Sequence, residues 1–154
     1  MKKHCLIVDD NALVRETTAC LVKHIASCPV RCCSDGEEAL RVFGNDPDAF
    51  ACVVTDFNMP GIDGLELGRR LRALAPDVKL LLVTGNPCAL DGIDVKERGF
   101  HRVLSKPFDM ALLRDALNFL SPAPGEHDAP GCGVYWDRDV PFFEGSRGVI
   151  TAAA

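Results

Sequence analysis

This sequence of 154 residues lacks a long apolar run, a secretory signal and an excess of positive charge. No apolar stretch approaches the roughly 20 residues that cross a bilayer. The basic and then apolar start is interrupted by Asp9 and Asp10, too early for a signal peptide. The formal net charge of −5 gives no electrostatic reason to expect nucleic acid or an anionic membrane as a partner. We therefore expect a soluble, cytoplasmic protein with no nucleic acid and no membrane among its partners.

The eight cysteines include no Cys-x-x-Cys pair, which argues against a zinc site or a thiol redox centre. In a reducing cytoplasm we expect most of them to be small buried hydrophobic residues. Cys5 and Cys52 fall in apparent core strands. The group Cys28, Cys32 and Cys33 is the exception that the sequence leaves open.

Short apolar runs alternate with helical patterns over the first 120 residues, which is the length of one domain with one core. The predicted strands are 4–8, 30–33, 53–55, 78–83 and 102–104. Each is followed by a predicted helix: one capped by Asn11, one opened by a capping box from Asp35 to Glu38, then 65–74, 88–98 and one opened by Asp109. Gly92 interrupts the pattern of the fourth helix. Alternation of this kind predicts an α/β three-layer sandwich with a five-stranded parallel sheet and five helices.

The pattern ends at Ser121. Nine of the last 34 residues are Pro or Gly, a level at which disorder is expected. This part nevertheless holds Tyr135, Trp136, Phe142 and Phe143. Such aromatic residues indicate either a docking segment or a flap on the same domain. We therefore divide the chain into a domain, residues 1–120, and a flexible tail, residues 121–154, with no output domain.

Polar side chains follow four of the predicted strands. Asp9 and Asp10 follow the first, Asp56 the third, Thr84 the fourth and Lys106 the fifth. Parallel strands bring their carboxyl ends to one edge of the sheet, where ligands bind in α/β proteins. Each residue alone could be a turn or surface residue. Their joint placement predicts a functional site.

The three acids would repel one another by roughly 3 kcal/mol per pair at about 5 Å and an effective dielectric near 20. A bound cation removes this repulsion, and oxygen ligands of this kind suit Mg²⁺. A carboxylate such as Asp56 can also attack phosphorus and form an aspartyl phosphate. Lys106 and the Thr84 hydroxyl would then stabilise the transferring phosphoryl oxygens.

These residues resemble the receiver domain of bacterial two-component response regulators, the CheY-like proteins. The similarity covers residues 3–120. It rests on segments 6–11, 34–40, 54–64, 82–85 and 105–108, which occur in the family's order and spacing. The resemblance implies a flavodoxin-like sheet of order 2-1-3-4-5. It also implies a role for each site residue: Asp56 as phosphoacceptor, Asp10 and Asp56 as direct metal ligands, Asp9 as a ligand through water, Asn58 as a ligand through its backbone carbonyl, and Lys106 and Thr84 at the phosphoryl group.

A receiver of this kind implies a single-domain response regulator that is not an enzyme in the usual sense, although it supports its own phosphorylation and dephosphorylation. Its phosphoryl donor would be a sensor histidine kinase or a histidine phosphotransfer protein, and its output a contact with a downstream protein. A homodimer through the last strand and helices is left open.

One position departs from the family pattern. Val103 stands three residues before Lys106, where the family often has Tyr or Phe, so the usual Thr–aromatic switch is in question. Movement of the loop after Thr84 is the alternative readout. Two other functions stay open: a pseudo-receiver that works unphosphorylated, and an aspartate-nucleophile phosphatase. Asn58 argues against the phosphatase, which usually has a second acid at that place.

Overall fold

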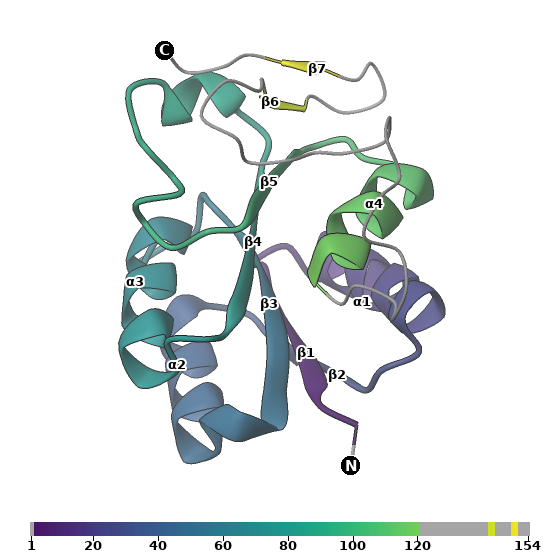
Figure 1. Ribbon diagram of the computed structural model, residues 1–154, viewed down its shortest axis with the longest axis vertical. Coiled ribbons are helices and arrows are strands. Elements are labelled where there is room, and N and C mark those ends of the chain that lie inside the picture. Colours follow the sequence, from purple (N-terminus) through teal and green to yellow (C-terminus); the bar gives the residue numbers. More distant parts are fainter. Residues whose placement is uncertain (1, 121–141, 144–148, 151–154) are drawn as a thin grey trace.

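The computed structural model describes residues 2–120, 142–143 and 149–150. Its centre is a five-stranded sheet in the order β2-β1-β3-β4-β5, and all neighbouring strands are parallel (Figure 1). The strands are β1 (His4–Val8), β2 (Val30–Cys33), β3 (Phe50–Asp56), β4 (Lys79–Thr84) and β5 (Arg102–Ser105). The predicted strands and their order are confirmed. The third begins three residues earlier than expected and includes Asp56 itself.

Four α-helices cover the sheet: α1 (Ala12–Ala26), α2 (Gly36–Asn45), α3 (Gly64–Leu74) and α4 (Met110–Leu120). Figure 1 shows α1 and α4 on one face of the sheet and α2 and α3 on the other, which gives the three predicted layers. Short polar side chains begin these helices, because they accept backbone N–H groups that have no partner within the helix. The side chains of Asn11, Asp35, Asp63 and Asp109 each accept the N–H three residues later.

The central strands β1, β3 and β4 are almost entirely buried because both faces of the sheet are covered, whereas the edge strand β2 has exposed residues. Alternate residues of one strand point to opposite faces. In β1, Leu6 and Val8 belong to the core on the side of α2 and α3. Cys5 and Ile7 belong to the core on the side of α1 and α4. The buried strands thereby hold the residues at their carboxyl ends in a fixed arrangement.

The predicted helix over residues 88–98 is wrong. The chain between β4 and β5 contains only a short 3-10 helix, η2 (Pro87–Leu90), followed by turns. Gly92 adopts a positive φ angle of 77°, which interrupts a right-handed helix. Another 3-10 helix, η1 (Pro47–Ala49), precedes β3. The described part of the chain therefore has four α-helices rather than five.

The seven cysteines in the described residues, among them Cys28, Cys32 and Cys33, are all free. Their burial is more varied than predicted. Cys5, Cys33 and Cys52 are buried, whereas Cys20, Cys32 and Cys88 are exposed. The exposed three lie on the outer side of a helix, on the edge strand β2 and in η2.

The predicted tail, with Tyr135 and Trp136, falls outside the described residues except for two short strands. These are β6 (Phe142–Phe143) and β7 (Val149–Ile150), which pair antiparallel, and β6 lies beside β5. Among the residues that the structure describes, no helix has the length and apolarity needed to cross a bilayer.

Candidate functional site

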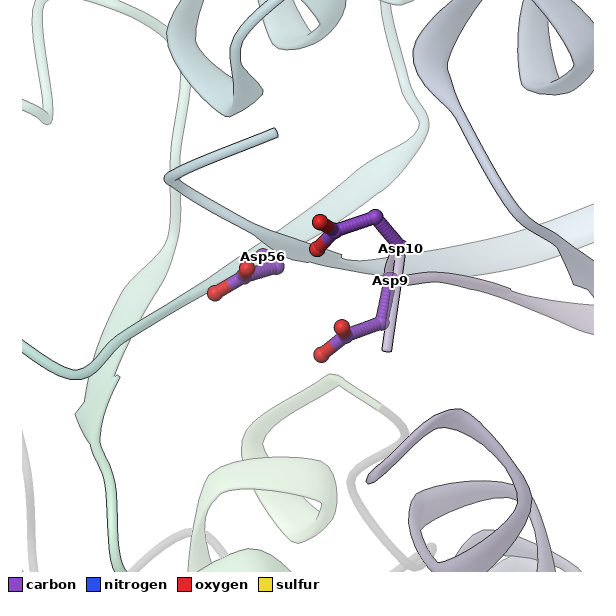
Figure 2. A group of neighbouring side chains, drawn as sticks. All are labelled: Asp9, Asp10 and Asp56. Carbon is purple, nitrogen blue, oxygen red and sulfur yellow. The ribbon is translucent and has the colours of Figure 1, made fainter. Parts of the chain in front are cut away.

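Three carboxylates meet at the edge of the sheet where β1 and β3 end. Asp9 and Asp10 directly follow β1, and Asp56 is the last residue of β3. One oxygen from each lies within 4.8 Å of the other two. Figure 2 shows the three side chains grouped at this edge. Asp9 and Asp56 are buried, with 5% and 7% exposure, whereas Asp10 is exposed. The predicted acidic cluster is therefore present.

Lys106 bridges the two buried acids. Its Nζ lies 2.9 Å from Oδ2 of Asp9 and 3.1 Å from Oδ1 of Asp56. The residue directly follows β5, and its backbone N–H donates to the carbonyl oxygen of Thr84 at 2.7 Å. Burial lowers the pKa of Lys106, but the contacts with Asp9 and Asp56 outweigh it, so the pKa is raised overall. The lysine therefore stays a cation between the two carboxylates.

The pKa of Asp56 is raised. Burial is the largest cause, and the negative charges of Asp9 and Asp10 act in the same direction. Lys106 opposes them through its charge and its hydrogen bond, without cancelling them. A second positive charge among these oxygens would favour the ionised form of Asp56.

The Asp9 side chain and backbone are held by α1 and its cap. The backbone N–H of Asn11 donates to Oδ1 of Asp9 at 2.9 Å. Arg15 Nη1 donates to the backbone oxygen of Asp9 at 2.7 Å. Sequence reasoning assigned no role to Arg15. The available signal was its position four residues after the helix cap Asn11. A residue at that spacing lies one helical turn from the cap, on the same face, near the loop that precedes the helix.

Thr84 lies at the same edge, at the end of β4. Asp56 pairs in register with Val83, so Thr84 is one residue beyond that partner, and it pairs in turn with Ser105. Its side chain is fully buried, and Oγ1 accepts the backbone N–H of Asn86 at 3.1 Å. The hydroxyl hydrogen is not used by that bond. Thr84 can therefore donate to a group bound in the site.

The turn after Asp56 packs tightly against the end of β3. The N–H of Phe57 donates to the carbonyl oxygen of Val83 at 2.7 Å, and that of Gly64 donates to Phe57 at 2.9 Å. A Cβ on Gly64 would collide with the backbone oxygen of Asp56. Only glycine allows α3 to begin so close to the acid. Asn58 lies in this turn with an exposed side chain, and the metal-ligand role of its carbonyl stays a prediction.

Val103, the position that departs from the family pattern, is a buried core residue on the side of α2 and α3. The nearest aromatic residue before it, Phe100, is also buried, and its ring lies where a Cβ on Gly68 of α3 would be. The adjacent His101 accepts the Leu80 N–H through Nδ1 at 3.1 Å. No aromatic ring therefore stands three residues before Lys106 to respond to Thr84.

A doubly wound parallel sheet with clustered carboxylates, a lysine and a buried threonine at its carboxyl edge defines a class of α/β domains that bind their ligands at that edge. The sequence profile of the response regulator receiver domain matches residues 5–118. The chain belongs to this family, as the sequence motifs predicted. Receiver domains act as phosphoacceptors in signalling, not as conventional enzymes, and bind Mg²⁺ at an acidic cluster.

Known relatives agree with this assignment. Response regulator MprA of Mycobacterium sp. (strain KMS) is 34% identical over 135 residues, which are 84% of this chain and 56% of MprA. The chain thus spans a little over half the length of that relative. The response regulator receiver protein CpdR of Brucella abortus (strain 2308) is 35% identical over 118 residues, 77% of this chain and 92% of CpdR. The structure of the chemotaxis protein CheY4 of Vibrio cholerae shares the fold, with a TM-score of 0.69, 24% identity and coverage of 78% and 99% of the two chains.

Proposed function

We propose that this chain accepts a phosphoryl group on Asp56 from a sensor histidine kinase or a histidine phosphotransfer protein and signals through contact with a downstream protein. The observation that carries the proposal is the Lys106 bridge. One ammonium group contacts both Asp9 and Asp56 within an oxygen cluster at the carboxyl edge of a parallel sheet. A structural ion pair would need only one of these acids.

The donor set fits Mg²⁺. All candidate ligands are oxygen atoms, and burial, together with the charges of Asp9 and Asp10, raises the pKa of Asp56 despite its contact with Lys106. Asp10 and Asp56 would bind the ion directly, Asp9 through water and Asn58 through its carbonyl. The bound ion would supply positive charge at the phosphoryl oxygens.

The transfer itself needs little more than positioning. A carboxylate oxygen of Asp56 attacks phosphorus, the bond from phosphorus to the donor's histidine nitrogen breaks, and that nitrogen keeps the electron pair. The ammonium of Lys106 stabilises the charge on the phosphoryl oxygens. Thr84 donates its free hydroxyl hydrogen to one of them while its oxygen still accepts the N–H of Asn86.

Because residue 103 is Val rather than an aromatic residue, another segment must change conformation when Asp56 is phosphorylated. Thr84 is tied to Asn86, the start of the irregular segment between β4 and β5. We propose that this segment, rather than residue 103, responds when Thr84 contacts the phosphoryl group.

Residues 1–120 would be the receiver, located in the cytoplasm, and residues 121–154 a separate segment. A homodimer through β5 and the neighbouring helices would be one form of output, with no nucleic acid or membrane contact.

Incubation with Mg²⁺ and acetyl phosphate tests the proposal. We expect intact mass spectrometry to show one added phosphoryl group on the wild-type chain and none on Asp56→Asn. Asp77→Asn, which removes an exposed acid after α3, is the matched control and keeps the adduct. Absence of an adduct on the wild type would favour the pseudo-receiver. Continuous release of phosphate from p-nitrophenyl phosphate would instead indicate the phosphatase.

A further inference from the structure

We propose that Arg15 is a positioning residue that holds the loop between β1 and α1 so that Asp9 and Asp10 can bind a divalent cation. The proposal rests on the metal-dependent function above and adds a residue to which neither the motifs nor the family resemblance gave a role. Arg15 is half-buried on the first turn of α1. Its Nη1 donates to the backbone oxygen of Asp9 at 2.7 Å, a short bond with a charged donor.

Three hydrogen bonds close a ring around this loop. Arg15 donates through its side chain to Asp9, and through its backbone N–H to the carbonyl oxygen of Asn11 at 2.9 Å. Asn11 in turn donates its backbone N–H to Oδ1 of Asp9 at 2.9 Å. The ring joins the helix start, its cap and the first acid. Loss of the Arg15 side chain removes the hydrogen bond to Asp9 and so opens the ring.

The bond to Asp9 also acts on Asp10. The carbonyl oxygen of Asp9 belongs to the planar peptide unit that joins Asp9 to Asp10. When the guanidinium holds this oxygen, it fixes the orientation of the whole unit and hence the direction in which Asp10 leaves the backbone. Asp10 is the exposed member of the acidic cluster and has fewer packing constraints than Asp9 or Asp56. It therefore depends most on this backbone contact.

Positioning and simple charge effects predict opposite results. Arg15 carries a positive charge close to the acids, and a positive charge repels a divalent cation. If charge alone mattered, replacing Arg15 by a neutral residue would tighten Mg²⁺ binding. If Arg15 positions the ligands, the same replacement weakens binding, as happens when groups that orient metal ligands are removed.

The test is a Mg²⁺ titration of the full chain by calorimetry. We expect Arg15→Met to weaken binding about tenfold or more, and Arg15→Lys, which retains a donor, to stay within about threefold of wild type. Arg41→Met removes an exposed arginine from α2 and is the matched control, expected to bind as wild type. Equal or tighter binding by Arg15→Met would overturn the proposal.

A second measurement needs no metal. Hydrogen exchange at the Asn11 amide, which donates to Asp9, is expected to be faster in Arg15→Met than in wild type, and near wild type in Arg15→Lys. Unchanged exchange would contradict the hydrogen-bonded ring.

If Arg15→Met does not fold, Arg15→Gln replaces it in the Mg²⁺ titration, because Gln keeps a hydrogen-bond donor but carries no charge. The charge explanation alone predicts that Arg15→Gln binds Mg²⁺ more tightly than the wild type. Failure of the wild type itself to bind Mg²⁺ would instead refute the proposed metal-dependent function.

Discussion

Replacing Lys106 by Met removes the ammonium group between two buried carboxylates but keeps a side chain of similar length. The contacts of 2.9 Å to Asp9 and 3.1 Å to Asp56 are each worth roughly 5 to 6 kcal/mol as bare Coulomb attraction at an effective dielectric of about 20. Desolvation offsets most of this, and 24% of the lysine side chain is exposed to screening water. We expect Lys106→Met to lose about 2 to 4 kcal/mol of unfolding free energy at pH 7 without metal.

The pH dependence of this loss has a definite sign. The pKa of Asp56 in the folded protein is already raised by burial, and without Lys106 it rises further. The folded variant then binds more protons than its unfolded chain in the acidic range, so its stability falls as the pH rises through that range. The penalty relative to wild type is therefore largest at neutral pH and shrinks as the pH is lowered.

Urea denaturation at neutral and acidic pH, with and without Mg²⁺, measures these effects. Saturating Mg²⁺ is expected to restore much of the lost stability, because it supplies positive charge among the same oxygens. Lys23→Met, on the exposed side of α1, controls for loss of a lysine elsewhere. Wild-type stability of Lys106→Met at pH 7 without metal, or a penalty that grows as the pH falls, would refute the electrostatic account.

Two further changes test neighbouring parts of the fold. Burial, and next the charge of Lys79, lower the pKa of His101 to about 4 from an ordinary 6.5, so neutral His101 stabilises the fold above pH 6.5 and this contribution is lost toward pH 4. Relative to His101→Gln, the wild type is expected to lose about 1 to 3 kcal/mol over that range after allowance for the half-exposed ring, and parallel pH curves would contradict this. Gly64→Ala places a methyl group against the backbone of Asp56 and is expected to cost about 2 to 3 kcal/mol in urea denaturation. Gly44→Ala, which meets no atom within 4 Å in α2, is expected to be neutral or to gain up to about 1 kcal/mol, so similar effects of the two changes would argue against the steric explanation.

Much of the fold could be predicted because its signals are local. The apolar runs of β1 and β4 and the capping residues Asn11 and Asp35 act over a few neighbouring positions, and the structure confirms them. The acidic cluster was also predictable, because parallel strands bring their carboxyl ends to one edge whatever the length of the connections. The sequence alone thus determined the layers, the edge that carries the site and the acids that form it.

Other features depend on contacts between distant parts of the chain. Lys106 contacts Asp9 across 97 positions of sequence, and nothing near either residue specifies that pair. The exposure of Cys32 follows from the place of β2 at the edge of the sheet. Only tertiary packing decided these features, because burial and ion pairing depend on neighbours that local sequence patterns do not identify.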